Sequence, residues 1–147
     1  MQQLDLHNKQ ENFRTFNGTP PPRRVGQDFP ILTKLSESYK LWHNYFNNLP
    51  RHTKFTLGTK IDNLFSECLE LSLTAGYTKK EEKGQLILKL SAKFDALKFF
   101  LQLLWGVGAL NNKKYSELSQ QLSTIGKMIG GWINSPKEKP AQNSAGN

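Results

Sequence analysis

The sequence has little cysteine and no long apolar run. Its single cysteine, Cys68, excludes an internal disulfide framework and any paired-cysteine metal or redox site. No stretch approaches the ~18–20 consecutive apolar residues that a membrane-spanning helix needs. The first residues lack the positive start and apolar block of a secretory signal. We therefore expect a soluble protein of a reducing compartment, the cytoplasm, with no membrane partner.

Motifs for catalysis and for metal or cofactor binding are also missing. The sequence has no HExxH, no GxxxxGK[ST], no GxGxxG after a strand and no GxSxG. Cys68 falls on an apolar helix face, where burial raises the pKa of a thiol and makes it a poor nucleophile. We predict a protein that is not an enzyme and holds no metal or cofactor. We expect no catalytic or metal-binding role for His7, His43, His52, the pair Glu67 and Glu70, or the pair Glu81 and Glu82.

Large apolar residues are concentrated in residues 29–134, which we predict to be the single folded domain. Residues 1–28 contain three consecutive prolines, which favour an extended polyproline segment over a helix, so we expect a flexible arm. Residues 135–147 contain no aromatic or large aliphatic side chain. Burial therefore cannot offset the entropy of ordering them, and we expect a disordered tail.

Four stretches of residues 29–134 have apolar side chains at helical spacing. The predicted helices span residues 33–48, 53–75, 78–107 and 113–134. Gly76 has the position of a left-handed C-cap for the second helix, and Thr78 with Glu81 matches a capping box for the third. No alternating pattern predicts a strand, and the short connections favour antiparallel neighbours. We predict an all-α, up-down-up-down four-helix bundle.

The predicted third helix has two apolar stripes, whereas a surface helix of a small monomer needs only one. The first stripe contains Leu86, Leu90, Phe94, Leu97, Leu101 and Leu104. No helix is central in a four-helix layout, so we predict that the second stripe is an interface between subunits. This second stripe, roughly opposite the first, contains Leu88, Ala92, Ala96, Phe99 and Leu103.

Three glycines interrupt the predicted fourth helix, namely Gly126, Gly130 and Gly131. Each costs about 1 kcal/mol of helix propensity relative to alanine. We therefore expect a large ring or a neighbouring helix to lie against the bare backbone at these positions.

Positive charge is the main chemical feature of the sequence. Lysine and arginine total 20 against 12 aspartate and glutamate, a formal net charge of +8. Residues 29–134 alone hold 14 against 8. Such an excess favours binding to a phosphate backbone, with little sequence specificity and a steep dependence on salt. The candidate nucleic-acid-binding residues are Arg51, Lys54, Lys60, Lys89, Lys93, Lys98, Lys113, Lys114 and Lys127.

Four pieces of the chain carry a family resemblance, and the last two of them are specific in combination and spacing. The four pieces are Leu49-Pro50-Arg51 with Phe55-Thr56-Leu57-Gly58, Glu70-Leu71 with Ala75-Gly76, the block 96–101, and the block 125–132. Together they resemble the accessory variability determinant (Avd) family of diversity-generating retroelements, over roughly residues 39–132. The resemblance implies a four-helix bundle that assembles into a homopentameric barrel without an active site. It also implies two partners, the element's reverse transcriptase and its template RNA with the flanking RNA, and leaves DNA or an RNA–DNA hybrid open.

By position, Arg51, Lys98 and Lys127 fall where the family pattern has basic residues. Gln102 departs from that pattern, because many relatives have arginine there, and the departure weakens the case for a basic ridge on that face. Residues 1–28 match no part of the family.

Other classes stay open at the level of sequence. The proteins encoded in intervening sequences of 23S ribosomal RNA genes share the basic, pentameric four-helix plan, but their Ser-Ile-Pro-Ser-Asn-like stretch is missing here. A general nucleic-acid-binding scaffold has the same charge. A scaffold for protein partners predicts no effect of charge reversal at Lys89, Lys93 and Lys98. An enzyme with a site between subunits would need a buried ionisable group in a cleft.

Overall fold

The computed structural model describes residues 29–146, with side chains to Asn134. The predicted arm, residues 1–28, lies outside the described residues. The described part of the chain is all α-helical. Its elements are α3 (Pro30–Asn47), α4 (Arg51–Thr53), the π-helical turn η1 (Lys54–Gly58), α5 (Thr59–Tyr77), α6 (Lys80–Gly106) and α7 (Asn112–Gly146).

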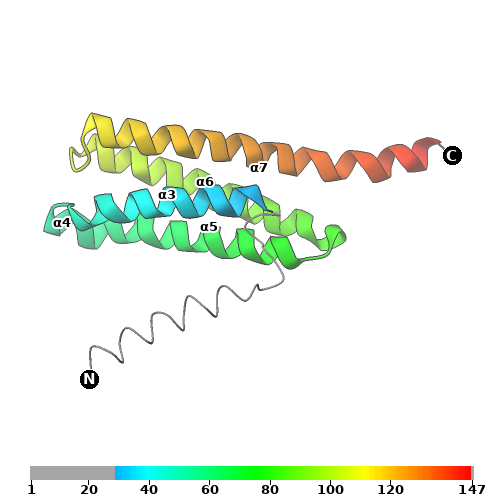
Figure 1. The fold of residues 1–147 in the computed structure, drawn as a ribbon, viewed down its shortest axis with the longest axis horizontal. Coiled ribbons are helices and arrows are strands. Elements are labelled where there is room, and N and C mark those ends of the chain that lie inside the picture. The colour runs from blue at the N-terminus through cyan, green and yellow to red at the C-terminus, as the bar shows by residue number, and fades with distance from the viewer. Residues whose placement is uncertain (1–28, 147) are drawn as a thin grey trace, which may run out of the picture.

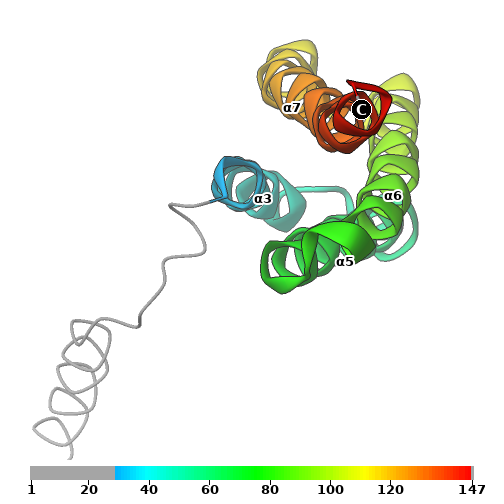
Figure 2. The same ribbon diagram turned by 90° about the vertical axis from the view of Figure 1, so that its right-hand side faces the viewer.

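The helices pack as a four-helix bundle. The elements α4, η1 and α5 follow one another without a break and together form one of its four helices. Successive helices run in opposite directions (Figure 1). Viewed along its length, the bundle has α3 and α6 at opposite corners, and each of them packs against both α5 and α7 (Figure 2). The predicted all-α bundle is confirmed.

The core side of α6 follows the helical period almost as predicted. Ile87, not Leu86, begins the buried row, because the buried positions alternate by three and four residues and the step back from Leu90 is three. Leu86 is only partly buried. The buried residues of α6 are Ile87, Leu90, Phe94, Leu97, Leu101 and Leu104.

Polar groups at the edge of the core join helices to one another. Both Tyr39 Oη and Trp42 Nε1 on α3 donate to Asp62 Oδ1 on α5, at 3.0 and 3.1 Å. The Tyr45 hydroxyl donates to Glu117 Oε1 on α7 at 2.7 Å. Buried polar groups need such partners, since an unmet donor in a core costs free energy. These bonds therefore fix the rotation of α3 against its two neighbours.

The ends of α5 and α6 differ from the predicted caps. Gly76 lies inside α5, which continues to Tyr77, and Gly108 (φ 82°) is the positive-φ residue of the described chain. The Thr78 hydroxyl donates to the Thr74 carbonyl at the end of α5, so it is engaged there and forms no capping box for α6. The predicted C-cap and capping box were wrong because the chain stays helical one residue past Gly76.

The backbone of α7 runs to Gly146, beyond the predicted helix end at Asn134. The start is one residue earlier than predicted, at Asn112, and Asn111 Oδ1 accepts from the Lys114 N–H at 2.9 Å as a cap. The added segment contains helix-favouring lysine, glutamate, alanine and glutamine but also Pro136 and Pro140, which disfavour a helix interior, so local propensity does not explain its helical backbone. The division of the chain into domain and tail at residue 134 stays a prediction. Across the described residues, no helix is long and apolar enough to cross a membrane.

Candidate nucleic-acid interface

The outward face of α6 carries the second apolar stripe. Leu88, Phe99 and Leu103 are 54%, 58% and 39% exposed, and Ala92 is exposed as well. Ala96 is half-buried and packs against the core, so it is the least exposed member of the stripe. Within the described chain this row has no covering helix, because α5 and α7 pack on the other side of α6. Its part in assembly stays a prediction.

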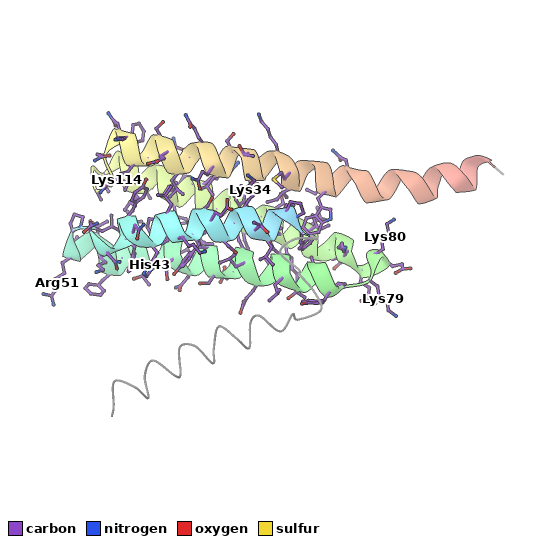
Figure 3. All side chains as sticks on the ribbon, viewed as in Figure 1. Lys34, His43, Arg51, Lys79, Lys80 and Lys114 are labelled. Atoms are coloured by element: carbon purple, nitrogen blue, oxygen red, sulfur yellow. The ribbon has the colours of Figure 1, made fainter. Side chains whose placement is uncertain are left out.

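Four of the nine candidate cations lie at one end of the bundle. Arg51 opens α4 and Lys114 lies at the start of α7, at the same end of the bundle and opposite Lys79 and Lys80 (Figure 3). Lys54 is held over the Phe46 ring at 5.4 Å, and Lys114 over the Tyr45 ring at the same distance. Such contacts stabilise an ammonium group without neutralising it. The remaining cation of this end is Lys113, which is exposed.

Three more candidates follow the seam between α5 and α6. Lys60 on α5 lies 5.6 Å from the centre of the Phe100 ring on α6. Lys93 Nζ lies 3.1 Å from Glu67 Oε1 across the seam, whereas Lys89, one turn earlier, is exposed without a described ion pair. Of the three, Lys93 is the one that forms an ion pair among the described residues.

The last two candidates, Lys98 and Lys127, line a groove between α6 and α7. Lys98 Nζ lies 5.5 Å from the centre of the Phe94 ring and 3.9 Å from Asp95 Oδ1. The nine cations therefore form three separate groups, at the bundle end, at the α5–α6 seam and in the α6–α7 groove. Spacing along single helices could not predict this division, which depends on the rotation of each helix.

Lys83, which is not among the nine candidate residues, lies close to two aromatic rings. Its ammonium lies 5.8 Å from the ring centre of Phe29 and 5.9 Å from that of Trp132, and these two rings meet edge to face at 4.6 Å. Contact between Trp132 and the start of α3 depends on the fold, and the sequence carries no signal for it.

The glycines of α7 are only partly explained by close packing. A Cβ at Gly126 would lie 3.4 Å from Phe94 Cε2 and 3.7 Å from Lys98 Nζ. Gly130 and Gly131 have no described atom within 4 Å of such a Cβ. A Cβ at Gly126 would therefore make only ordinary van der Waals contact with the Phe94 ring, and the close approach expected at Gly130 and Gly131 is wrong for the described part of this chain.

A comparison with family models decides the family. The model described as bAvd-like matches residues 31–136, which is most of the chain and includes every helix of the bundle. The chain belongs to the bAvd-like family. No curated protein and no solved structure matches it. The match favours the Avd side over the intervening-sequence proteins, and bAvd-like proteins are generally non-catalytic accessory proteins of diversity-generating retroelements.

The thiol and the possible metal ligands of the described residues can be placed in the structure. Cys68 is buried on α5, and burial, followed by the charge of Glu67, raises the pKa of its thiol to about 12. A thiol with this pKa holds its proton at neutral pH and does not act as a nucleophile. Among the described residues, no three histidine, cysteine or acidic side chains gather closely enough to hold a metal ion.

Proposed function

We propose that this bAvd-like protein is the non-catalytic accessory subunit of a diversity-generating retroelement, and that it acts as a basic homopentameric ring. In this role it binds the template RNA with its flanking RNA and the element's reverse transcriptase in the cytoplasm, and supports mutagenic cDNA synthesis by that enzyme. The observation that carries the proposal is the exposed apolar row of Leu88, Phe99 and Leu103, which runs along α6 between lysines.

Assembly through α6 follows from the cost of leaving this row in water. Large apolar side chains that recur along one helix face mark an interaction site more often than scattered ones do. The row continues to Val107, which is 59% exposed at the end of α6. A closed ring of identical chains would bury it in every copy, and the number five comes from the family.

RNA binding would depend on the positive charge of the folded domain, which assembly into a ring multiplies. Residues 29–134 carry six more cationic than anionic side chains, and each copy in a ring adds the same excess. A polyanion that neutralises several of these cations releases bound counterions, so its affinity falls steeply with salt. The same chemistry accepts DNA or an RNA–DNA hybrid, which makes these the competing ligands.

The test uses the full chain. Sedimentation should give a particle of several subunits, and its affinity for template RNA should fall by about tenfold or more between 50 and 200 mM salt. The reverse transcriptase should co-sediment with the protein. A single-chain particle without salt-dependent RNA binding would overturn the proposal. A ring that binds the polymerase but no RNA would instead support the protein-scaffold alternative.

A further inference from the structure

The α6–α7 groove is a concave surface on the described part of the chain. It brings together lysine side chains and serine hydroxyls that have no hydrogen-bond partner among the described residues. It consists of two adjoining hollows of about 450 and 390 Å³. Both hollows share Asp95, Lys98 and Ser119, so they form one continuous channel along the two helices. The smaller hollow also reaches Gln102, Tyr115 and Phe99 of the outward stripe. The polar side chains that line the larger hollow are Ser91, Asp95, Lys98, Ser119, Ser123 and Lys127.

The donors in this groove are free to act on a ligand. Among the described residues, no hydrogen bond is formed by the hydroxyls of Ser91, Ser119 or Ser123, and Lys127 has no ion pair. Lys98 is only loosely paired, at 3.9 Å from Asp95. Ammonium and hydroxyl groups together are the side-chain donors that phosphate oxygens accept from.

Gly126 keeps the channel open at its centre. Its missing side chain leaves room beside Phe94 Cε2 and Lys98 Nζ, at 3.4 and 3.7 Å from where a Cβ would lie. Glycine in a helix interior lowers stability by about 1 kcal/mol relative to alanine. Here it leaves the Lys98 ammonium accessible from the α7 side.

Asp95 gives the groove a second kind of chemistry. Its carboxylate accepts hydrogen bonds and repels phosphate, so a simple anion site would not include it. A ribose offers the 2′-hydroxyl as a donor, which is the group that distinguishes RNA from DNA. One acceptor placed among phosphate-binding donors therefore fits a ribose–phosphate chain better than a free anion.

We infer that the α6–α7 groove binds the ribose–phosphate backbone of an RNA strand. Lys98, Lys127 and the serine hydroxyls donate to its phosphate oxygens, and Asp95 accepts from a 2′-hydroxyl. This inference rests on the proposed function, RNA binding, and adds where the strand lies and what distinguishes it from DNA.

The first test blocks the groove without changing its charge. Gly126→Leu places a side chain in the channel, while Gly131→Leu makes the same change on an exposed position of the same helix with no atom within 4 Å. Affinity for an unstructured RNA oligonucleotide should fall by about tenfold in Gly126→Leu, the loss expected for one charge-assisted contact. The control should stay within about twofold of the wild type. Circular dichroism and sedimentation establish that both variants keep the fold and subunit number.

The second test concerns the sugar. Wild-type protein should bind RNA more tightly than DNA of the same sequence. Asp95→Ala should lower the ratio of RNA affinity to DNA affinity, because it removes the acceptor. The lost negative charge by itself would strengthen both ligands alike.

The two proposals fail in different ways. Wild type without RNA affinity overturns the proposed function. Wild-type binding that survives Gly126→Leu unchanged overturns only the groove, and an RNA-to-DNA ratio that Asp95→Ala leaves unchanged overturns the role of the sugar.

Discussion

Lys93 Nζ and Glu67 Oε1 lie 3.1 Å apart and join α6 to α5 beside the outward apolar stripe. The two side chains are 47% and 45% exposed, and pairs this accessible contribute only about 0–1 kcal/mol to stability. Their larger effect is on the surface potential, because Glu67 offsets the charge of Lys93, one of the nine candidate nucleic-acid-binding residues.

Under the proposed function, this pair should make Lys93 contribute less to RNA binding than its neighbour Lys89. We expect Lys89→Gln to weaken RNA binding and to lower the slope of log affinity against log salt by about one. Lys93→Gln should change both less, since its charge is already met by Glu67. Affinities measured across a salt series check this. Equal slopes for the two variants would contradict it, and Glu67→Gln should strengthen binding.

The α6 stripe should control assembly. Phe99→Glu places a charge in the middle of the exposed row and should dissociate the particle into single chains, because burying an unpaired carboxylate is costly. Leu73→Glu is the matched control, since Leu73 is 43% exposed on α5. Sedimentation distinguishes the two outcomes. If Leu73→Glu dissociates the particle and Phe99→Glu leaves it intact, the interface lies on another face.

Stability should fall at alkaline pH. Burial, and then Glu67, raises the pKa of Cys68 from 9.0 to about 12. Burial, and then the hydrogen bond to Glu117, raises that of Tyr45 from 10.0 to about 12. The folded chain keeps both protons where the unfolded chain releases them. Their stabilisation is therefore complete below about pH 9 and is lost as the pH rises towards 12.

Urea unfolding at pH 8 and at about pH 10.5 measures this loss. The double variant Cys68→Ala, Tyr45→Phe should start from a lower free energy of unfolding, because it loses core packing and a hydrogen bond. Its further decrease between the two pH values should be smaller than that of the wild type. An equal decrease would show that other groups cause the alkaline loss.

The close packing around Gly58 should make a larger residue at this position destabilising. Gly58 is buried in the π-helical turn, where a Cβ would lie 3.0 Å from Leu49 Cδ1 and 3.1 Å from Phe46 Cε1. Gly58→Ala should lower the free energy of unfolding by about 1–3 kcal/mol, because two side chains must move. Gly84→Ala, with open space around it, should raise stability by up to about 1 kcal/mol. Chemical denaturation of both variants checks the difference in sign.

The glycines also show how far local sequence can predict packing. Helix propensity identifies Gly126, Gly130 and Gly131 as equally costly, yet only Gly126 lies against a neighbouring ring. The π-helical turn at residues 54–58 has no periodic signal either. The buried cysteine was predictable, since an apolar period of three and four residues places it in the core.

The sequence by itself determined the four helices, the two apolar sides of α6 and the positive charge of the folded part. These features depend on spacing within one helix or on composition, which do not change with the arrangement of neighbours. Only the tertiary structure decided how that charge is divided. It paired Lys93 with Glu67 and placed Lys98 and Lys127 in one groove, because contacts between helices depend on how each helix is rotated when its core face is buried.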